Sequence, residues 1–147
     1  MAEGGVVVGV DGSEGSRRAL QWALEEARVR GAPLRAVFAW SYLDQPGEGF
    51  DAAYGEDDAR QRLDRALEEV AGDVGDVEVE RVVVVDLPAR ALLDAARDAD
   101  LLVVGSRGVG GFKGLLLGSV SQQVVQHAPC PVVVVPGDER PPPPSGG

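Results

Sequence analysis

The sequence predicts an α/β fold: a single doubly wound domain with a five-stranded parallel sheet and helices on both faces. Two observations lead to this prediction. Valine-rich runs without polar alternation recur along the chain, as expected of strands that are covered on both faces. Segments with apolar residues at helical spacing separate these runs, so strand and helix alternate throughout. We expect the strand order 3-2-1-4-5 with right-handed crossovers, in which the first and fourth strands are neighbours.

Each expected element follows from a local pattern. The first strand is a β-branched run that stops at the turn-and-cap cluster Asp11-Gly12-Ser13, and Ser13 or Ser16 is the expected N-cap of the next helix. Proline, glycine and acidic residues between Ser41 and Gly55 are typical of a loop. In chain order, we expect a strand over 6–10, a helix ending at 31, a strand over 34–40, a loop over 41–55, a helix from about 57 to 72, a strand over 77–85, a helix after Pro88, a strand over 101–104, a helix from near 118 and a strand over 132–135.

Length and composition limit the class of protein. A chain of 147 residues fits one domain, for which we expect residues 1–136, and the proline- and glycine-rich segment 137–147 is expected to be a solvated tail. The formal net charge of −10 disfavours binding to nucleic acid. The apolar runs are shorter than the ~18 residues that cross a bilayer. With one cysteine and no apolar leader, we expect a cytoplasmic protein.

The stretch from Gly105 to Ser121, GSRGVGGFKGLLLGSVS, is rich in glycine and lies between a strand and a helix. Glycines allow the backbone to approach a ligand closely, and the first turn of a helix offers unpaired N–H groups and about half a positive charge. The stretch therefore predicts an anion site that suits a phosphate. The alternative is a connector that binds nothing, but such a loop is costly to order without a ligand.

A second region is expected at the same place. In the order 3-2-1-4-5 the chain winds in opposite directions from the first and fourth strands, and ligands of such sheets bind beyond the carboxyl ends of these strands. Those ends are Gly9-Val10-Asp11 and Val104-Gly105. Asp11 and the glycine-rich stretch should therefore face one crevice.

These residues resemble a known family. The spacing Gly105-x2-Gly108-x9-Gly118-Ser119 is similar to the signature of the ATP-binding universal stress proteins. The start VGVDGS, from Val8, and the ending HAPCPVVVV, from His127, extend the resemblance over about residues 5–136. The resemblance implies a sheet of order 3-2-1-4-5, an adenine nucleotide at the switch point and a homodimer.

The resemblance also implies roles for individual residues. Asp11 would lie beside the ribose, Gly9 and Val10 would leave space for it, and the backbone near Trp40 would contact the adenine. Residues of the glycine-rich stretch would bind the ribose and phosphates: Gly105, Arg107 and Gly108 as lining, and Gly118, Ser119, Val120 and Ser121 through backbone N–H groups and hydroxyls. Lys113 would add positive charge. A Mg²⁺ or Mn²⁺ ion would bridge the phosphate oxygens.

Several of these residues allow a simpler interpretation. Asp11 is as well suited to cap a helix as to bind ribose. His127 is expected to serve a helix end, Cys130 to be an inert, buried thiol, and Trp22 and Trp40 to be packing residues. The chain contains no Gly-Lys pair, no GxGxxG and no GxSxG, which excludes the Walker loop, the dinucleotide fingerprint and the nucleophile elbow.

Two functions remain after these exclusions. The first is an ATP-binding regulatory module of a stress response, and the alternative is a slow ATPase or nucleotidyl-transfer enzyme that uses the same site. Hydrolysis requires a group that activates water near the γ-phosphate, and the site offers only Asp11, which the resemblance places at the ribose. We therefore favour binding. The last strand, Val132, Val133, Val134 and Val135, is an uncharged sheet edge, so we also expect a homodimer formed through this strand.

Overall fold

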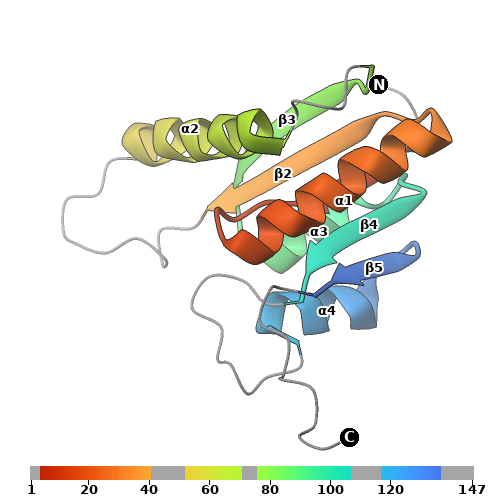
Figure 1. Ribbon diagram of the computed structural model, residues 1–147. Helices are drawn as coiled ribbons and strands as arrows, with labels where there is room; N and C mark the ends of the chain where they lie inside the picture. The colour runs from red at the N-terminus through yellow and green to blue at the C-terminus, as the bar shows by residue number, and fades with distance from the viewer. Residues whose placement is uncertain (1–3, 41–51, 71–75, 107–116, 137–147) are drawn as a thin grey trace, which may run out of the picture.

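Figure 1 shows the computed structural model, which describes residues 4–40, 52–70, 76–106 and 117–136. Five parallel strands form one sheet of order β3-β2-β1-β4-β5, which confirms the predicted fold class and strand order. The elements are β1 (Val6–Gly9), α1 (Glu14–Arg30), β2 (Leu34–Trp40), α2 (Ala52–Val70), β3 (Val79–Val85), α3 (Pro88–Ala95), β4 (Leu101–Gly105), α4 (Ser119–His127) and β5 (Val132–Val135).

Two helices cover each face of the sheet. In Figure 1, α1 and α2 lie on the near side and α3 and α4 on the far side. Side chains alternate between the two faces along β1: Val6 and Val8 pack in the core under α1 and α2, and Val7 packs in the core under α3 and α4. Burial on both faces explains why the strands are valine-rich runs without polar alternation.

The centre of the sheet is the most deeply buried part of the molecule. β1 pairs with β2 through Val6 and Leu34 and with β4 through Val6 and Leu101. These three residues are almost completely buried, whereas all four residues of the edge strand β5 are half-buried. The pairing of β1 with β4 extends to Val8 and Val103, so the carboxyl ends of these two strands lie side by side, where the sequence predicts a ligand.

One boundary differs clearly from the prediction. We expected a loop up to Gly55 and a helix from about Asp57, but α2 begins at Ala52. Two alanines, the strongest helix formers, open the helix, and glycine lowers helix stability by only about 1 kcal/mol, so Gly55 does not prevent it. Gly55 is buried. The remainder of the expected loop and the expected tail, 137–147, lie outside the described residues.

Within the described ranges, none of the helices has the length and apolar character needed to cross a membrane. The two longest helices are amphipathic, with buried apolar residues such as Leu20 in α1 and Leu63 in α2.

Candidate functional site at the carboxyl ends of β1 and β4

Two helices begin at the carboxyl edge of the sheet, beside the ends of β1 and β4. The chain leaves β1 through Val10, whose N–H donates to the carbonyl of Val37 at 2.9 Å, and α1 follows after a short turn. β4 ends at Gly105, and α4 begins at Ser119. The prediction that these two regions converge is supported by the direct pairing of β1 with β4.

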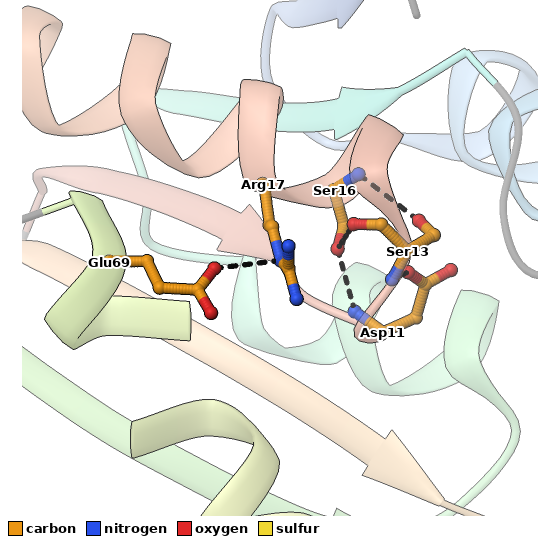
Figure 2. Close-up of polar contacts among 5 residues, drawn as sticks. All are labelled: Asp11, Ser13, Ser16, Arg17 and Glu69. Atoms are coloured by element: carbon orange, nitrogen blue, oxygen red, sulfur yellow. Dashed lines mark hydrogen bonds and ion pairs between the residues drawn. The ribbon is translucent and has the colours of Figure 1, made fainter. Parts of the chain in front are cut away.

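The first turn of α1 is satisfied by its own residues (Figure 2). Ser13 is the N-cap: its hydroxyl oxygen accepts a hydrogen bond from the N–H of Ser16 at 3.1 Å. The hydroxyl of Ser16 donates to the carbonyl of Ser13 at 3.0 Å. Of the two candidates for this cap, Ser13 is therefore the N-cap, and Ser16 bonds back to it from within the helix.

Asp11 closes the turn that precedes α1. Its Oδ1 accepts a hydrogen bond from the N–H of Ser13 at 2.9 Å, and its own N–H donates to the hydroxyl oxygen of Ser16 at 3.2 Å. Gly12, between them, has φ +84°, which favours glycine. The alternative that Asp11 is the N-cap is therefore wrong. Its side chain is partly exposed, and a carboxylate has acceptor positions beyond one hydrogen bond.

The first turn of α4 is built differently. Gly118 is its N-cap, in an extended conformation with φ −74° and ψ 171°, and no side chain caps the helix. The N–H of Gly118 donates to the carbonyl of Ser106 at 2.6 Å. The N–H groups of Ser119, Val120 and Ser121 are those that a helix leaves without an intrahelical partner. They form the donor set that the sequence assigns to the phosphates.

Ser121 fastens this turn to the end of β4. Its hydroxyl donates to the carbonyl of Gly105 at 2.6 Å, and the residue is 3% exposed. We expected this hydroxyl to be a phosphate donor, and in the structure it has an internal acceptor. Ser119, at the first helical position, is exposed. Ser121 therefore positions the α4 turn, and its backbone N–H remains part of the predicted donor set.

Gly105 lies where β4, α1 and α4 meet. A Cβ atom at this position would lie 3.0 Å from the backbone C and O of Gly15, in the first turn of α1. Only glycine allows this approach without a shift of the backbone. The two helix starts are therefore joined through one residue: Gly15 packs against Gly105, and Ser121 donates to its carbonyl.

Gly9 and Trp40 lie at the same edge of the sheet, but other parts of the protein pack against both. A Cβ at Gly9 would lie 2.9 Å from Cδ1 of Leu92, so the space beside Gly9 is filled by a side chain of α3. Trp40 is buried at the end of β2, and its carbonyl accepts the N–H of Asp86 at 3.0 Å. Three residues of the predicted site, Arg107, Gly108 and Lys113, lie outside the described residues.

Arg17 and Glu69 form an ion pair that the sequence does not indicate. It joins the start of α1 to the last turn of α2, with Nε of Arg17 3.1 Å from Oε2 of Glu69, and both side chains are partly exposed (Figure 2). No motif signals such a pair, because its members are far apart in sequence. Ser106 was also missed, although it lies within the glycine signature.

In the described part of the chain, no three His, Cys, Asp or Glu side chains are grouped as a metal site. A cation held here would need oxygen ligands from a bound phosphate chain. Cys130 is half-buried, and burial, with the nearby Asp100 carboxylate, raises the pKa of its thiol. A raised pKa keeps the thiol protonated at neutral pH and therefore unreactive.

The family of the chain follows from its similarity to other proteins. The model of the universal stress protein family matches residues 5–136. The chain belongs to the universal stress protein family. It is 45% identical over 132 residues to universal stress protein Rv2005c of Mycobacterium tuberculosis, covering 88% of this chain and 44% of that protein. The chain thus spans less than half the length of this family member.

Solved structures of universal stress proteins share the fold. One, in complex with cAMP, is 32% identical with a TM-score of 0.62, and the match covers 94% of this chain and all of that one. A universal stress protein from Archaeoglobus fulgidus, in complex with dAMP, is 28% identical with a TM-score of 0.69, and the match covers 92% of this chain and 99% of that one. Both of these family members are bound to adenine nucleotides.

Proposed function

We propose that this chain binds an adenine nucleotide, ATP with Mg²⁺ or Mn²⁺, at the carboxyl ends of β1 and β4, and acts as a nucleotide-dependent regulatory module in a stress response. The observation that carries the proposal is the α4 turn, which has no side-chain cap and is held against the end of β4 by the bonds from Gly118 to Ser106 and from Ser121 to Gly105. Such a turn presents N–H groups and the positive end of a helix to an anion.

The described residues fit the parts of a nucleotide. The N–H groups of Ser119, Val120 and Ser121 suit the phosphate chain, and the partly exposed carboxylate of Asp11 suits the ribose hydroxyls as an acceptor. The close contact of Gly105 with Gly15 keeps the N–H groups of the α4 turn and the carboxylate of Asp11 at adjacent strand ends. The cAMP and dAMP complexes of two family members support an adenine nucleotide rather than another anion. The metal ion would add positive charge at the phosphates.

The identity of the nucleotide can be determined directly. Denaturing the purified protein and separating any released nucleotide by chromatography would show which ligand it retains. Titration with ATP, AMP and cAMP by calorimetry, with and without Mg²⁺, would then rank them. We expect all three to compete for one site and ATP to depend on the metal. A protein that binds none of them would contradict the proposal.

Within this proposal, the site binds ATP without efficient hydrolysis. The carboxylate of Asp11 lies at the junction of β1 and α1, and the proposal places it at the ribose, away from the γ-phosphate. Phosphate release from ATP and Mg²⁺ should therefore be slow. Many turnovers per minute, lost in the Gly118→Ala variant, would favour the alternative of an ATPase.

We also propose a homodimer formed through β5. This strand is last in the order of the described sheet and pairs with β4 on one side, and its four valines, Val132–Val135, are half-buried. An antiparallel pair with a second copy would satisfy the outer N–H and C=O groups. Light scattering should show a dimer that Val133→Lys or Val134→Pro disrupts, provided circular dichroism shows both variants folded. Val85→Lys, on the opposite edge, is the matched control.

A further inference from the structure

Ser106, the residue after β4, is bonded both to the edge strand β5 and to the first turn of α4. Its N–H donates to the carbonyl of Val135, the last residue of β5, at 2.9 Å. Its own carbonyl accepts the N–H of Gly118, the N-cap of α4, at 2.6 Å. One residue therefore connects the end of β5 to the proposed phosphate-binding turn by two main-chain hydrogen bonds.

The side chain of Ser121 makes a second polar connection between these elements. Its hydroxyl donates to the carbonyl of Gly105 at 2.6 Å, and Gly105 is the residue of β4 that lies opposite Val135 in the register of the sheet. Ser121 is buried, so water cannot easily replace this bond. The first turn of α4 is thus held by two consecutive residues, Gly105 and Ser106, which also pair with the end of β5.

Apolar side chains connect α4 with β5 as well. Val124 of α4 is buried in the core under α3 and α4, and the half-buried side chains that pack against this core include Val120, Val132 and Val134. Val120 belongs to the first turn of α4, and its N–H is one of the proposed phosphate donors. Because closely packed side chains transmit small shifts, a displacement of this turn would disturb the packing on β5 as well as the bonds at Ser106.

The connected end of β5 includes main-chain groups that a second copy would bind. The main-chain groups of successive residues in a strand point to alternate sides, and the carbonyl of Val135 points to β4. The N–H and C=O of Val134 therefore point to the outer edge of the described sheet, where the proposed antiparallel pair forms. They lie next to the bond that joins Val135 to Ser106.

We propose that nucleotide binding at the α4 turn and dimer formation through β5 strengthen each other, an inference that rests on the proposed function. A phosphate bound to the N–H groups of the α4 turn would hold Gly118 against Ser106, and pairing with a second copy would hold the end of β5. Because both events order the same backbone at Ser106, whichever occurs first reduces the entropy that the second must lose. Linkage requires the two effects on affinity to be equal in size.

The coupling can be measured on the full chain, freed of any retained nucleotide. Sedimentation velocity over a range of protein concentrations gives the dissociation constant of the dimer, without nucleotide and with ATP and Mg²⁺ at a concentration that calorimetry shows to be saturating. We expect the nucleotide to lower this constant about tenfold, within the usual range of coupling between two sites.

The reciprocal effect is measured on the nucleotide. Wild-type protein diluted below its dimer dissociation constant should bind ATP about tenfold more weakly than the dimer does, because linkage is reciprocal. The variant Val134→Pro, which loses an N–H at the outer edge, should show the same weaker binding at every protein concentration, provided circular dichroism shows it folded.

Ser121→Ala tests whether the coupling passes through the start of α4. Without the bond to Gly105, nucleotide should lower the dimer dissociation constant by less than about threefold, even when the variant is saturated with ATP. A loss of stability alone would not change the ratio of the two dimer constants. The control is Gln123→Ala, at an exposed position of α4, which should keep the full effect. An undiminished effect in Ser121→Ala would contradict coupling through this turn.

The outcomes also distinguish this coupling from the proposals on which it rests. A protein that binds no adenine nucleotide would contradict the proposed function and the coupling together. Nucleotide that binds monomer and dimer equally well, and leaves the dimer dissociation constant unchanged, would overturn the coupling alone. A wild type that stays monomeric at saturating nucleotide would overturn the coupling and the dimer, and would leave the proposal of nucleotide binding intact.

Discussion

The helices α1 and α4 both begin at the carboxyl edge of the sheet, but their first turns are satisfied in different ways. α1 uses its own sequence: Ser13 caps it, and Asp11 and Ser16 close the turn around that cap. α4 has no side-chain cap and is held from outside, by Gly118 bonded to Ser106 and Ser121 bonded to Gly105.

This difference separates a structural turn from a candidate binding turn. A side-chain cap occupies N–H groups that an anion would otherwise use, so α1 is less suited to bind phosphate through its backbone. α4 is fixed in place by bonds that leave its next N–H groups, at Ser119 and Val120, at the open end of the helix. Changes at the α4 turn should therefore affect ligand binding, and changes at the α1 turn should affect stability.

Gly118→Ala has the largest expected effect. A methyl group at the buried start of α4 would keep phosphate away from the N–H groups of the first turn, and displacement of one donor costs about 1–3 kcal/mol. Because φ of −74° is accessible to alanine, the fold should be kept. Calorimetry should show ATP affinity lowered about 5- to 150-fold, with urea unfolding nearly unchanged. Unchanged affinity would place the ligand elsewhere.

Ser121→Ala tests the bond that holds α4 to β4. It removes a donor from the carbonyl of Gly105, and loss of a partner in a buried site costs about 1–3 kcal/mol of unfolding free energy. Urea unfolding measures this loss, and nucleotide affinity should fall as well, because the α4 turn is no longer held in place. Ser119→Ala, at an exposed position two residues earlier, is the control and should leave stability nearly unchanged.

Ser13→Ala tests the internal cap of α1. Loss of the bond from the N–H of Ser16 should lower the unfolding free energy by about 1 kcal/mol. Nucleotide affinity should change less than in Gly118→Ala, since the cap is not among the proposed donors. If Ser13→Ala reduced affinity as strongly as Gly118→Ala at equal stability, the distinction between the two turns would be lost.

Arg17→Ala has the smallest expected effect. The ion pair of Arg17 with Glu69 is partly exposed on both sides, and such pairs contribute about 0–1 kcal/mol. Thermal or urea unfolding should show a slight loss of stability that diminishes at high salt. The double variant Arg17→Ala/Glu69→Ala should lose no more unfolding free energy than the two single variants lose together. A double-mutant cycle would measure this difference.

Much of the fold was predictable because its signals are local. Uninterrupted valines at β1 and β5 indicated covered strands, and Leu34–Trp40 was predicted with both boundaries correct. The start of α2 was missed because proline and glycines nearby outweighed the two alanines that open the helix. Strand order also followed, since parallel strands with right-handed crossovers allow few arrangements.

The candidate site was predictable as a place but not as a set of bonds. The glycine spacing and the position of Asp11 after a strand indicated where two segments meet. They did not indicate that Ser121 donates to Gly105 or that Leu92 fills the space beside Gly9. Each of these depends on how closely two elements approach, which local sequence does not encode.

The sequence by itself determined the alternation of strands and helices, the glycine-rich stretch and the surplus of acidic residues, because each is a property of neighbouring residues. The tertiary structure decided which polar groups bond to one another and which surfaces stay open. Gly105 is close to Gly15 only because β4 and α1 pack together. Contacts between elements far apart in the chain follow from packing, and packing is settled only when the whole core is assembled.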